Sequence, residues 1–374
     1  MAREAFSIGH SEAPSWREAV ERCLDELHPL PAAANLGFVY LTDALAGHAR
    51  DALEAFRERA PGVRWVGTVG MGICGPGVEY YTQPAIAALV GAFPDDSFRV
   101  FSAMVSGLRG FDAGHRAWCA RSRPYFGVVH GDPRHHAIAE LVAGLSERME
   151  DGFLVGGLAS SRGRYPQIAD DVVDGGLSGV LFNAEVPVTT RLTQGCSPIG
   201  PRHEITRADE QILIELDRRP ALDVFKEDIG EVLARDLSRV GGYIFAGLPV
   251  AGSDTGDYLV RNLVALDPRN NMLAVADTVS TGQSVMFCRR DAQSAQQDLL
   301  RMLGEIKRSL SGPPRAGIYH SCIARGTNLF GPDSRELKLI EQELGTFPLV
   351  GFFGNGEISH NRLYGYTGVL TLFL

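Results

Sequence analysis

The sequence predicts an α/β fold of mixed α+β type, in which repeated βαββ units form mixed sheets in two abutting domains. Three observations support this prediction: a unit that occurs three times, strand-like runs that alternate with helix-like stretches, and a length of 374 residues, which is long for one core. Hydrophobic residues make up 45% of the chain and charged residues 22%, as in ordinary globular proteins.

The repeated unit is a short apolar strand, a helix-like stretch, a second strand that ends in Val-Gly, and a third strand. Its copies begin with Gly-Phe-Val-Tyr at 37–40, Gly-Val-Val-His at 127–130 and Gly-Ile-Tyr-His at 317–320. Roughly 30 residues separate the first glycine from that of Val-Gly, which is about the size of a βαβ unit. The copies differ most in the glycine-rich loop after Val-Gly, so we expect a site there.

Helix signals accompany these strands. Apolar residues on one face predict a helix over 16–27, which Ser15 caps and a glutamate three residues on completes as a capping box. Asp132, followed by proline, is expected to cap a helix over 136–149. Further helices are predicted over 43–60, 221–240, 291–311 and 335–344. Further strands are predicted over 98–105, 186–192, 243–245, 258–266, 273–275 and 284–287, and the last four are expected to form an antiparallel meander.

The predicted domains are an N-terminal helical segment at 1–30, one domain at 31–218 and another at 219–374. The boundary rests on the polar, turn-like stretch Asp217–Pro220. No low-complexity linker separates the two larger domains, so we expect them to share an interface, where ligand clefts are common.

Composition argues against several classes of protein. The net charge of −9 and the lack of a basic stripe argue against a nucleic-acid partner. No apolar run is long enough to span a bilayer, and residues 1–14 lack the apolar stretch of a secretory signal, which predicts a cytoplasmic protein without a membrane partner. Six cysteines without a Cys-x-x-Cys pattern are expected to be free thiols.

Two motifs that could bind a nucleotide or a metal also have a simple structural explanation. Gly70–Gly75 fits the dinucleotide pattern Gly-x-Gly-x-x-Gly, but no helix-like run follows, so we favour a glycine-rich turn. His130, Asp132, His135 and His136 are of types that bind zinc or iron. A solvated start of a helix is the favoured alternative, because Asp132 is already expected to act as a cap.

His320 and Cys322 are two residues apart on a predicted strand and therefore share a face. A cysteine beside a histidine is typical of a nucleophile, and Arg325 would lower the thiol pKa if it lay close. A small buried cysteine at a strand end is the favoured alternative.

The strongest candidate site is the segment 351–357, with the sequence Gly-Phe-Phe-Gly-Asn-Gly-Glu. Alignment of the glycines places Glu357 opposite Ile73 of the first unit, so the third unit carries a carboxylate where the first is apolar. Arg325 could bind a ligand carboxylate in a fork, and Glu357 could bind an ammonium group. An ion pair between Arg325 and Glu357 that ties two loops together is the alternative.

Six segments also carry a resemblance to a known family. They are Leu-Val-Gly-Gly-Leu-Ala-Ser at 154–160, Gly-Leu-Ser-Gly-Val at 176–180, Gln-Gly-Cys-Ser-Pro-Ile-Gly at 194–200, Pro-Ala-Leu at 220–222, Ser-Cys-Ile-Ala-Arg-Gly at 321–326 and Gly-Phe-Phe-Gly-Asn-Gly-Glu-Ile at 351–358. Together they resemble the FIST family, named for F-box and intracellular signal transduction proteins. The resemblance runs from about Asn35 to the C-terminus.

The resemblance implies a FIST N region, then a FIST C region that begins near Pro220, and a sensory module that binds small ligands, amino acids among them, without catalysis. A chain without a kinase or cyclase of its own would signal to a partner protein such as a histidine kinase or a cyclase. Some relatives are haem proteins that sense nitric oxide, which makes non-covalent haem the alternative cofactor, with His130, His320 or His360 as its axial ligand.

We therefore expect a sensor with no resident cofactor or metal. The expected ligand-binding residues are Arg325, Asn355, Glu357, Gly354, Gly356, Cys322, Gln194, Cys196 and Ser160. The loop 194–200 would either close the site or form a rigid turn. A haem-based gas sensor and an enzyme with Cys322 as nucleophile are the alternatives, in that order. The Ala- and Arg-rich composition is typical of a GC-rich bacterium.

Overall fold

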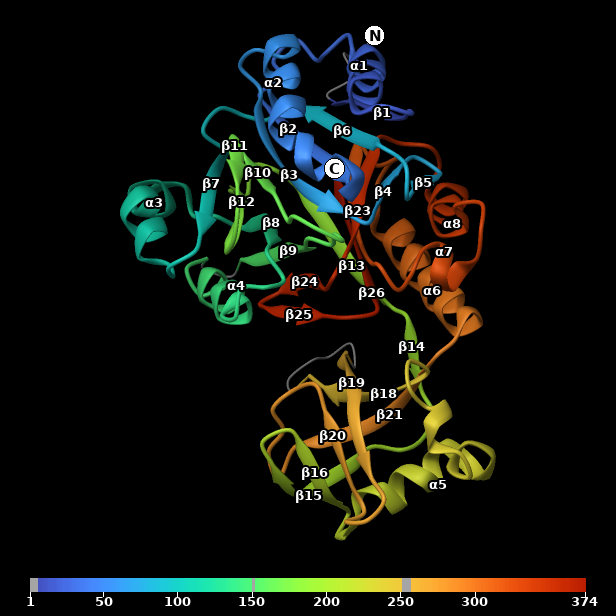
Figure 1. The fold of residues 1–374 in the computed structure, drawn as a ribbon. Helices are drawn as coiled ribbons and strands as arrows, with labels where there is room; N and C mark the ends of the chain where they lie inside the picture. Colours follow the sequence, from blue (N-terminus) through green and yellow to red (C-terminus); the bar gives the residue numbers. More distant parts are fainter. Residues whose placement is uncertain (1–5, 150–151, 251–256) are drawn as a thin grey trace. The chain divides into compact units, whose positions relative to one another are not determined.

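The computed structural model describes residues 6–149, 152–250 and 257–374 (Figure 1). The chain forms two compact units, of which the first contains Met1–Thr193 and Leu299–Leu374 and the second contains Gln194–Asp298. The second unit is therefore inserted into the sequence of the first. The domain boundary predicted at 218–219 lies inside this second unit.

Three six-stranded sheets build the first unit (Figure 1). Each contains the strands of one repeat, which are β2 (Leu36–Thr42), β3 (Arg64–Gly70) and β6 (Ala85–Gly91), then β8 (Phe126–Gly131), β9 (Phe153–Leu158) and β12 (Leu177–Phe182), and last β22 (Ala316–Cys322), β23 (Leu349–Gly354) and β26 (Thr367–Phe373). In every repeat the first two strands pair in parallel, and the third pairs antiparallel with the first. The predicted mixed fold with repeated βαββ units is confirmed.

The same steric constraint requires glycine in each of the three Val-Gly pairs. A Cβ atom at Gly67, Gly156 or Gly351 would lie 1.7, 1.9 or 1.8 Å from a carbonyl oxygen of the neighbouring parallel strand. No side chain fits at such a distance, so only glycine allows the two backbones to approach this closely. The three copies are therefore equivalent in packing as well as in sequence.

Each repeat also lends one short strand to the sheet of another repeat. β4 (Gly72–Gly75) of the first repeat pairs with β23, β24 (Glu357–His360) of the third pairs with β9, and β10 (Gln167–Ala169) of the second pairs with β3. These exchanges link the three sheets in a ring. They also cover strand edges that would otherwise leave backbone groups unpaired.

All three sheets have the same strand order, with an edge strand at each end. The edge strands are β1 (Phe6–Glu12), β5 (Val78–Tyr80), β7 (Phe98–Met104), β11 (Asp171–Val173), β13 (Val188–Gln194) and β25 (Arg362–Tyr364). β1, which was not expected from the sequence, pairs antiparallel with β6. Its side chains alternate poorly in polarity, so its strand conformation depends on this pairing.

The helices of the first unit pack on the faces of these sheets. They are α1 (Trp16–Leu27), α2 (Ala49–Arg59), α3 (Arg109–Ser122), α4 (Ile138–Ser146), α7 (Thr327–Phe330) and α8 (Arg335–Leu344), with a 3₁₀ helix at Asp43–His48; α6 (Ala292–Ser309) contains the second boundary between the units. The side chain of Ser15 accepts a hydrogen bond from the amide of Glu18 at 3.3 Å, which confirms the predicted cap of α1. α3 was not predicted.

The predicted cap of α4 is wrong. The helix begins at Ile138, and its N-cap, Ala137, makes no side-chain hydrogen bond. Asp132 instead accepts hydrogen bonds from the amide and the guanidinium of Arg134, at 2.9 and 2.7 Å. The acidic residue stabilises a turn that precedes the helix, because five residues separate it from the first helical turn.

The second unit is a closed ring of antiparallel strands with one kinked helix. The ring contains β15 (His203–Asp209), β16 (Ile212–Leu216), β20 (Met272–Val275), β19 (Tyr258–Asp267), β18 (Ile244–Pro249) and β21 (Ser284–Arg290). Two short strands, β14 (Cys196–Pro198) and β17 (Arg219–Pro220), and a 3₁₀ turn at Leu237–Arg239 accompany it. The last strand of the predicted meander, β21, pairs with β18 and β15, which closes the ring.

The helix of this unit, α5 (Ala221–Ala234), is interrupted at Gly230, where φ is 77°. Its first half buries Leu222 and Phe225 against the strands. The second half continues beyond the glycine, which is the residue that tolerates this backbone conformation.

The main core of the first unit lies where the inner faces of the three sheets meet. Phe38, Val128 and Ile318, at equivalent positions of the three repeats, belong to one buried cluster. α1 and α2 cover the opposite face of the first sheet through a second cluster that includes Leu24 and Phe56. Among the described residues, no helix is both long and apolar enough to cross a membrane.

Candidate functional site

The candidate site lies at the carboxyl ends of the parallel strands β22 and β23. The loops that follow these strands are joined by a hydrogen bond from the amide of Ile323 to the carbonyl oxygen of Gly354, at 2.9 Å. Cys322 is the last residue of β22, and Arg325 lies in the loop that follows. Asn355 lies in the second loop, and Glu357 is the first residue of β24. Loops at the carboxyl ends of strands are common ligand sites in α/β sheets.

Arg325 forms a fully buried ion pair, and its partner is Glu336 on α8. The two side chains are 0% exposed, and Nη2 of Arg325 lies 2.7 Å from Oε1 of Glu336. Glu336 also accepts hydrogen bonds from the hydroxyl of Tyr319 at 2.7 Å and the amide of Gly326 at 2.8 Å. The alternative prediction, an ion pair between Arg325 and Glu357, is therefore wrong: Arg325 does form an ion pair, but with Glu336.

The guanidinium of Arg325 is held on one side only. Its Nε and Nη2 atoms point to Glu336, whereas Nη1 is buried and has no hydrogen-bond partner among the described residues. The ring of Phe330 lies 5.1 Å from the guanidinium carbon. Burial opposes the charge of Arg325, but Glu336 and Tyr319 outweigh burial and raise its pKa.

Glu357 is fully buried, and only one of its two carboxyl oxygen atoms accepts a hydrogen bond among those found for the described residues. Its Oε2 atom accepts hydrogen bonds from the amide and the hydroxyl of Thr367, at 3.1 and 2.7 Å. Its Oε1 atom has no partner among the described residues. Burial raises the pKa of Glu357 to about 8, although Thr367, the charge of Arg325 and the thiol of Cys322 act in the opposite direction. Burial therefore favours the protonated form of this carboxyl group.

The strand registers show which residues of the other repeats are equivalent to Glu357. Ile73 lies opposite Phe352, Gln167 opposite Thr68 and Glu357 opposite Gly157, and each of these partners follows the glycine of a Val-Gly pair. The predicted alignment of Glu357 with Ile73 is therefore confirmed. The side-chain amide of Gln167 is satisfied on both sides, by the hydroxyl of Ser178 at 2.6 Å and a carbonyl oxygen at 3.1 Å. Only the third repeat has an incompletely bonded carboxyl group at this position.

Sequence reasoning missed Glu336 and Glu79. Glu336 lies on the buried face of α8 beside Leu337, and an acidic residue on an apolar helix face is the signal that could have identified it. Glu79 on β5 accepts a hydrogen bond from the hydroxyl of Tyr81 at 2.9 Å, and its Oε1 atom is buried without a partner among the described residues. Burial and the neighbouring Glu336 raise the pKa of Glu79 to about 7. A Cβ atom at Gly326 would lie 3.0 Å from Glu79 Oε2, so this carboxyl group borders the same loop.

Ser160 joins all three repeats. Its hydroxyl accepts a hydrogen bond from the amide of Met71 at 2.8 Å and donates one to the carbonyl oxygen of Phe353. Gly354, Asn355 and Gly356 lie at the same junction. The amide of Asn355 donates a hydrogen bond to the carbonyl oxygen of Leu158 at 2.9 Å, and the amide of Leu158 donates one to the carbonyl oxygen of Gly356 at 2.8 Å. The side chain of Asn355 is exposed. The structure thus brings these four predicted residues together.

Cys322 is buried, which raises the pKa of its thiol, and the neighbouring Glu357 adds to this effect. The charge of Arg325 lowers the thiol pKa as expected, but it is outweighed. His320 directs its Nε2 atom to Tyr40. The pair therefore lacks the lowered thiol pKa of an activated nucleophile.

Two of the three histidines considered as haem ligands lie in the centre of the first unit. His130 and His320 are 0% and 1% exposed, and their Nε2 atoms lie 3.1 and 3.3 Å from the hydroxyl of Tyr40. Burial lowers the pKa of His130 to about 3 and that of His320 well below its usual value. His360 is exposed, in the turn between β24 and β25. Among the described residues, no group of three His, Cys, Asp or Glu side chains is placed to hold a metal ion.

Gln194 and Cys196 belong to the second unit. The amide of Gln194 donates to Asp298 at 2.6 Å, and its side-chain amide donates to the carbonyl oxygen of Tyr258 at 3.2 Å. The hydroxyl of Tyr258 donates to the carbonyl oxygen of Cys196 at 2.6 Å. These bonds hold the loop in place within its own unit. That the loop closes over Arg325 stays a prediction.

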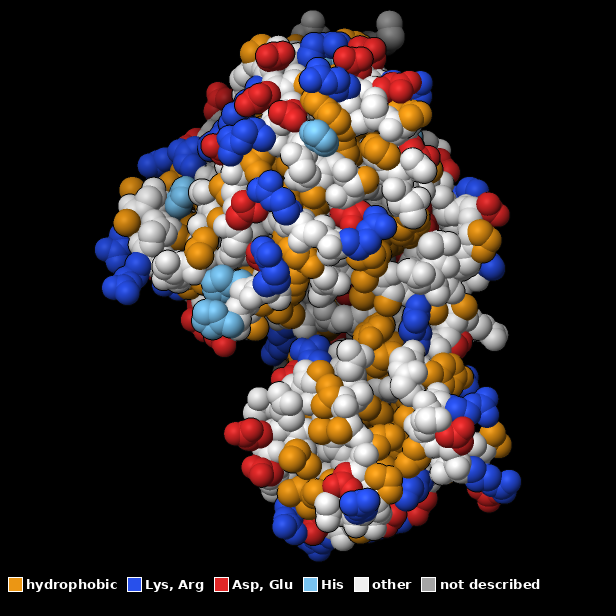
Figure 2. Space-filling model, in the orientation of Figure 1, with side chains coloured by type: hydrophobic (Ala, Val, Ile, Leu, Met, Phe, Trp, Pro, Cys, Tyr) orange, Lys and Arg blue, Asp and Glu red, His pale blue; other side chains and the backbone are white. Residues whose placement is uncertain are grey.

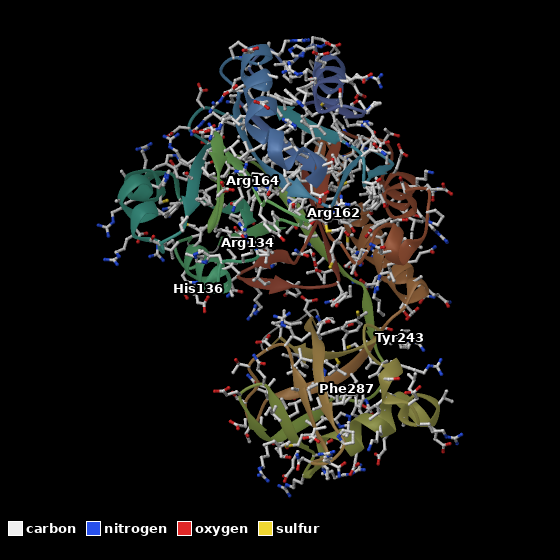
Figure 3. The ribbon with its side chains drawn as sticks, in the orientation of Figure 1. Arg134, His136, Arg162, Arg164, Tyr243 and Phe287 are labelled. Carbon is white, nitrogen blue, oxygen red and sulfur yellow. The ribbon has the colours of Figure 1, made fainter. Side chains whose placement is uncertain are left out.

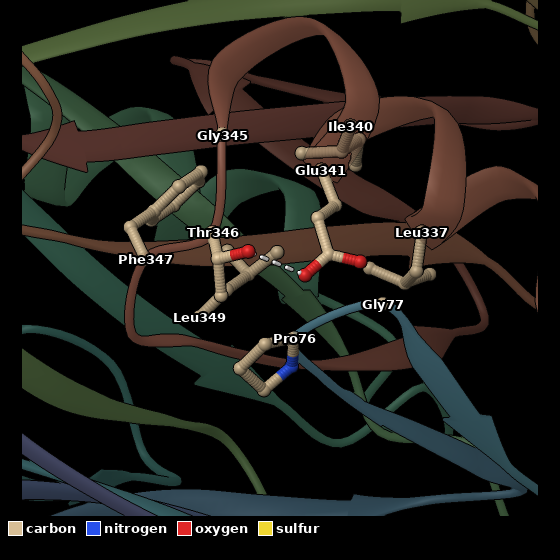
Figure 4. A pocket seen from close by; sticks show the side chains of 9 residues that line it. All are labelled: Pro76, Gly77, Leu337, Ile340, Glu341, Gly345, Thr346, Phe347 and Leu349. Atoms are coloured by element: carbon tan, nitrogen blue, oxygen red, sulfur yellow. Dashed lines mark hydrogen bonds between the residues drawn. The ribbon is translucent and has the colours of Figure 1, made fainter.

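A small cavity between α8 and the turn at Gly77 is too small for an organic ligand (Figure 4). Its volume is about 10 Å³, which is at the lower limit for one water molecule. Thr346 donates a hydrogen bond to Glu341 at its border, at 2.8 Å. This cavity therefore adds no ligand site to the loops described above.

Comparisons with known proteins agree with this architecture. The FIST N domain matches residues 35–219, and the FIST C domain matches residues 221–360. The chain is 31% identical to the uncharacterized protein Rv0628c of Mycobacterium tuberculosis H37Rv over 99% of both chains. It is 28% identical to the uncharacterized protein Mb0898c of Mycobacterium bovis, over 96% of this chain and 94% of that one. The chain therefore belongs to the FIST family, whose domains are sensory domains of signal transduction.

Proposed function

We propose that this protein senses a small zwitterion, an amino acid, at the carboxyl ends of β22 and β23, and signals to a partner protein. One observation carries the proposal: the loops that follow these strands contain a guanidinium and a carboxyl group, on Arg325 and Glu357, that each keep one buried polar atom without a partner. Buried polar atoms of this kind are uncommon and call for a ligand, a water molecule or another explanation.

The two groups suit the two ends of an amino acid. Nη1 of Arg325 can donate to a ligand carboxylate, while Glu336 keeps the other side of the guanidinium in place. Oε1 of Glu357 can accept from a ligand ammonium group. Because burial raises the pKa of Glu357, a bound ammonium group would favour release of its proton.

Access requires movement of the loop 354–357, because Arg325 and Glu357 are both 0% exposed. The exposed Asn355 lies at the tip of this loop, between two glycines. A ligand that binds only the open loop would shift the population toward that conformation, and a histidine kinase or a cyclase is the kind of partner that could read the change.

A thermal-shift screen of the amino acids tests this proposal, with Glu357→Gln as the variant and Glu54→Gln, on the exposed face of α2, as the matched control. We expect stabilisation that grows with ligand concentration in the wild type and in Glu54→Gln, and that is lost in Glu357→Gln. No stabilisation by any amino acid, or equal stabilisation of all three proteins, would overturn the proposal.

The haem alternative fits the described side chains poorly. The ring of Phe352 packs 5.4 Å from that of His320 and 5.9 Å from that of His130, and the hydroxyl of Tyr40 occupies the Nε2 side of both. A macrocycle would have to displace these groups. Soret absorption after addition of haem would support this alternative, and faster labelling of Cys322 than of the other cysteines would support the enzyme alternative.

A further inference from the structure

A second cavity, of about 580 Å³, lies beside α3 in the first unit, and none of its lining residues belongs to the proposed amino-acid site. Three arginines, Arg116, Arg123 and Arg148, line it together with one acid, Asp112. The volume is in the range of small-molecule sites. Figure 2 shows basic side chains in blue along this edge of the unit, which Figure 1 labels α3, and the basic residues of this segment are arginines.

The acid is already neutralised. Asp112 accepts two hydrogen bonds from Arg148, at 2.6 and 2.9 Å, and this pairing lowers the pKa of Asp112. A third hydrogen bond, to the carbonyl oxygen of Gly144 at 2.7 Å, fixes the same guanidinium. Within the described residues, the guanidinium groups of Arg116 and Arg123 form no hydrogen bond or close ion pair, although the charge of Arg116 also helps to lower the pKa of Asp112. The cavity is therefore positive, although the whole chain has a net charge of −9.

One face of α3 presents these groups. Arg116, Cys119 and Ala120 are spaced by three and four residues, so they share one face of α3, and Arg123 is the left-handed residue that ends the helix. The backbone at Arg123 is fixed, because its amide donates to the carbonyl oxygen of Cys119 at 3.0 Å and its φ is 46°. Phe111, Ala120 and Pro124 add apolar surface beside the two free guanidinium groups.

Other surface arginines of this unit form ion pairs with aspartates. Arg134, Arg162 and Arg164 are labelled together on the first unit in Figure 3. Each is paired with an aspartate, at 2.7, 2.6 and 3.5 Å, so their charges are balanced. At the cavity beside α3, by contrast, Arg116 and Arg123 line a concave surface without an ion-pair partner within the described residues.

We propose that this cavity binds an organic phosphate, that is, a phosphate monoester. Arg116 and Arg123 would bind the phosphate oxygens, because guanidinium forks match phosphate geometry and are only weakly hydrated. The organic part of the ligand would pack on Phe111, Ala120 and Pro124. This inference goes beyond the amino-acid site and does not depend on it.

Cys119 offers a direct readout of occupancy. It lines the cavity and is half-buried, whereas the other five cysteines are buried. We would measure the rate at which iodoacetamide labels Cys119, by peptide mass spectrometry, during titrations with phenyl phosphate and with inorganic phosphate. We expect phenyl phosphate to protect Cys119 at lower concentration than inorganic phosphate, because only the ester has an organic part.

The variants are Arg116→Gln and Arg123→Gln, and the matched control is Arg57→Gln, an exposed arginine on α2. Each cavity variant should weaken the protection roughly tenfold, the effect of one lost charge-assisted hydrogen bond, while the control keeps wild-type affinity. Absence of protection by phenyl phosphate, or equal protection in all variants, would overturn the proposal, and so would equal potency of inorganic phosphate. Amino-acid binding should be unchanged in these variants, so the two proposals fail independently.

Discussion

The hydroxyl oxygen of Tyr40 lies 3.1 Å from Nε2 of His130, although 90 residues separate them in the sequence. The same hydroxyl lies 3.3 Å from Nε2 of His320. All three residues occupy the fourth position of the repeated Gly-x-x-x segment, so equivalent positions meet in the centre of the first unit. A hydroxyl group can donate to one imidazole and accept from the other, which makes the tyrosine the link between the two histidines.

Tyr40→Phe should therefore destabilise the protein by about 1–3 kcal/mol, because it leaves two buried imidazole nitrogen atoms without a partner. Urea denaturation at neutral pH measures this change. Tyr125→Phe, at a tyrosine that is 40% exposed, is the control and should change stability little. Equal stability of the two variants would show that the hydroxyl of Tyr40 contributes nothing.

Acid should destabilise the wild type through the central histidines. His130 has a folded-state pKa of about 3, below its unfolded value, so its contribution to stability is present above pH 6.5 and is lost as the pH falls. From pH 7 to pH 5, His130→Gln should lose about 2 kcal/mol less stability than the wild type. His136→Gln, at an exposed histidine, is the control. Urea denaturation at both pH values measures these changes, and an equal loss of stability in the wild type and in His130→Gln would contradict the prediction.

Glu336→Gln should destabilise the protein by about 3–5 kcal/mol, because it leaves the charge of Arg325 buried without a counter-charge. Glu231→Gln is the matched control, since the ion pair of Glu231 with Arg235 is exposed and contributes little. Circular dichroism during thermal unfolding measures both. If Glu336→Gln unfolds like the control, the buried pair is not needed for the fold.

Glu357→Gln should change the pH dependence of stability in the direction opposite to His130→Gln. The folded-state pKa of Glu357 is about 8, above its unfolded value, so its contribution is complete below about pH 4.3 and is lost as the pH rises toward 8. The variant lacks this loss and should gain stability relative to the wild type between pH 5 and pH 8. Parallel curves of unfolding free energy against pH would contradict the raised pKa.

Ser160→Ala should cost about 1–3 kcal/mol, because it removes the partner of two backbone groups, the part-buried amide of Met71 and the buried carbonyl of Phe353. These two groups belong to the first and third repeats, so we also expect faster hydrogen exchange at the amide of Met71. Ser146→Ala, at the end of α4, is the control. Unchanged exchange at Met71 would argue against the junction.

Local patterns predicted much of the fold. The helix at 16–27 and its cap follow from apolar periodicity and Ser15, and the helix at 335–344 has the predicted bounds. The alignment of Glu357 with Ile73 also follows from the glycines, because only glycine allows the close approach of the parallel strands. Each of these features depends on residues that are near one another in the sequence or on a repeated steric requirement.

Other features depend on contacts between distant segments. β1 has a weak strand pattern and owes its conformation to β6, and the pairing of β4 with β23 joins two repeats. The partner of Arg325 is Glu336, because the fold of α8 onto its sheet places that carboxylate beside the guanidinium.

The sequence by itself determined that this chain is built from three copies of one unit, and which loop of the third copy carries an amide and a carboxyl group. Only the tertiary structure decided which polar atoms of Arg325 and Glu357 are left without a partner. The reason is physical: a glycine requirement or a helix period acts over a few residues, whereas burial and ion pairing depend on every segment that packs around a side chain.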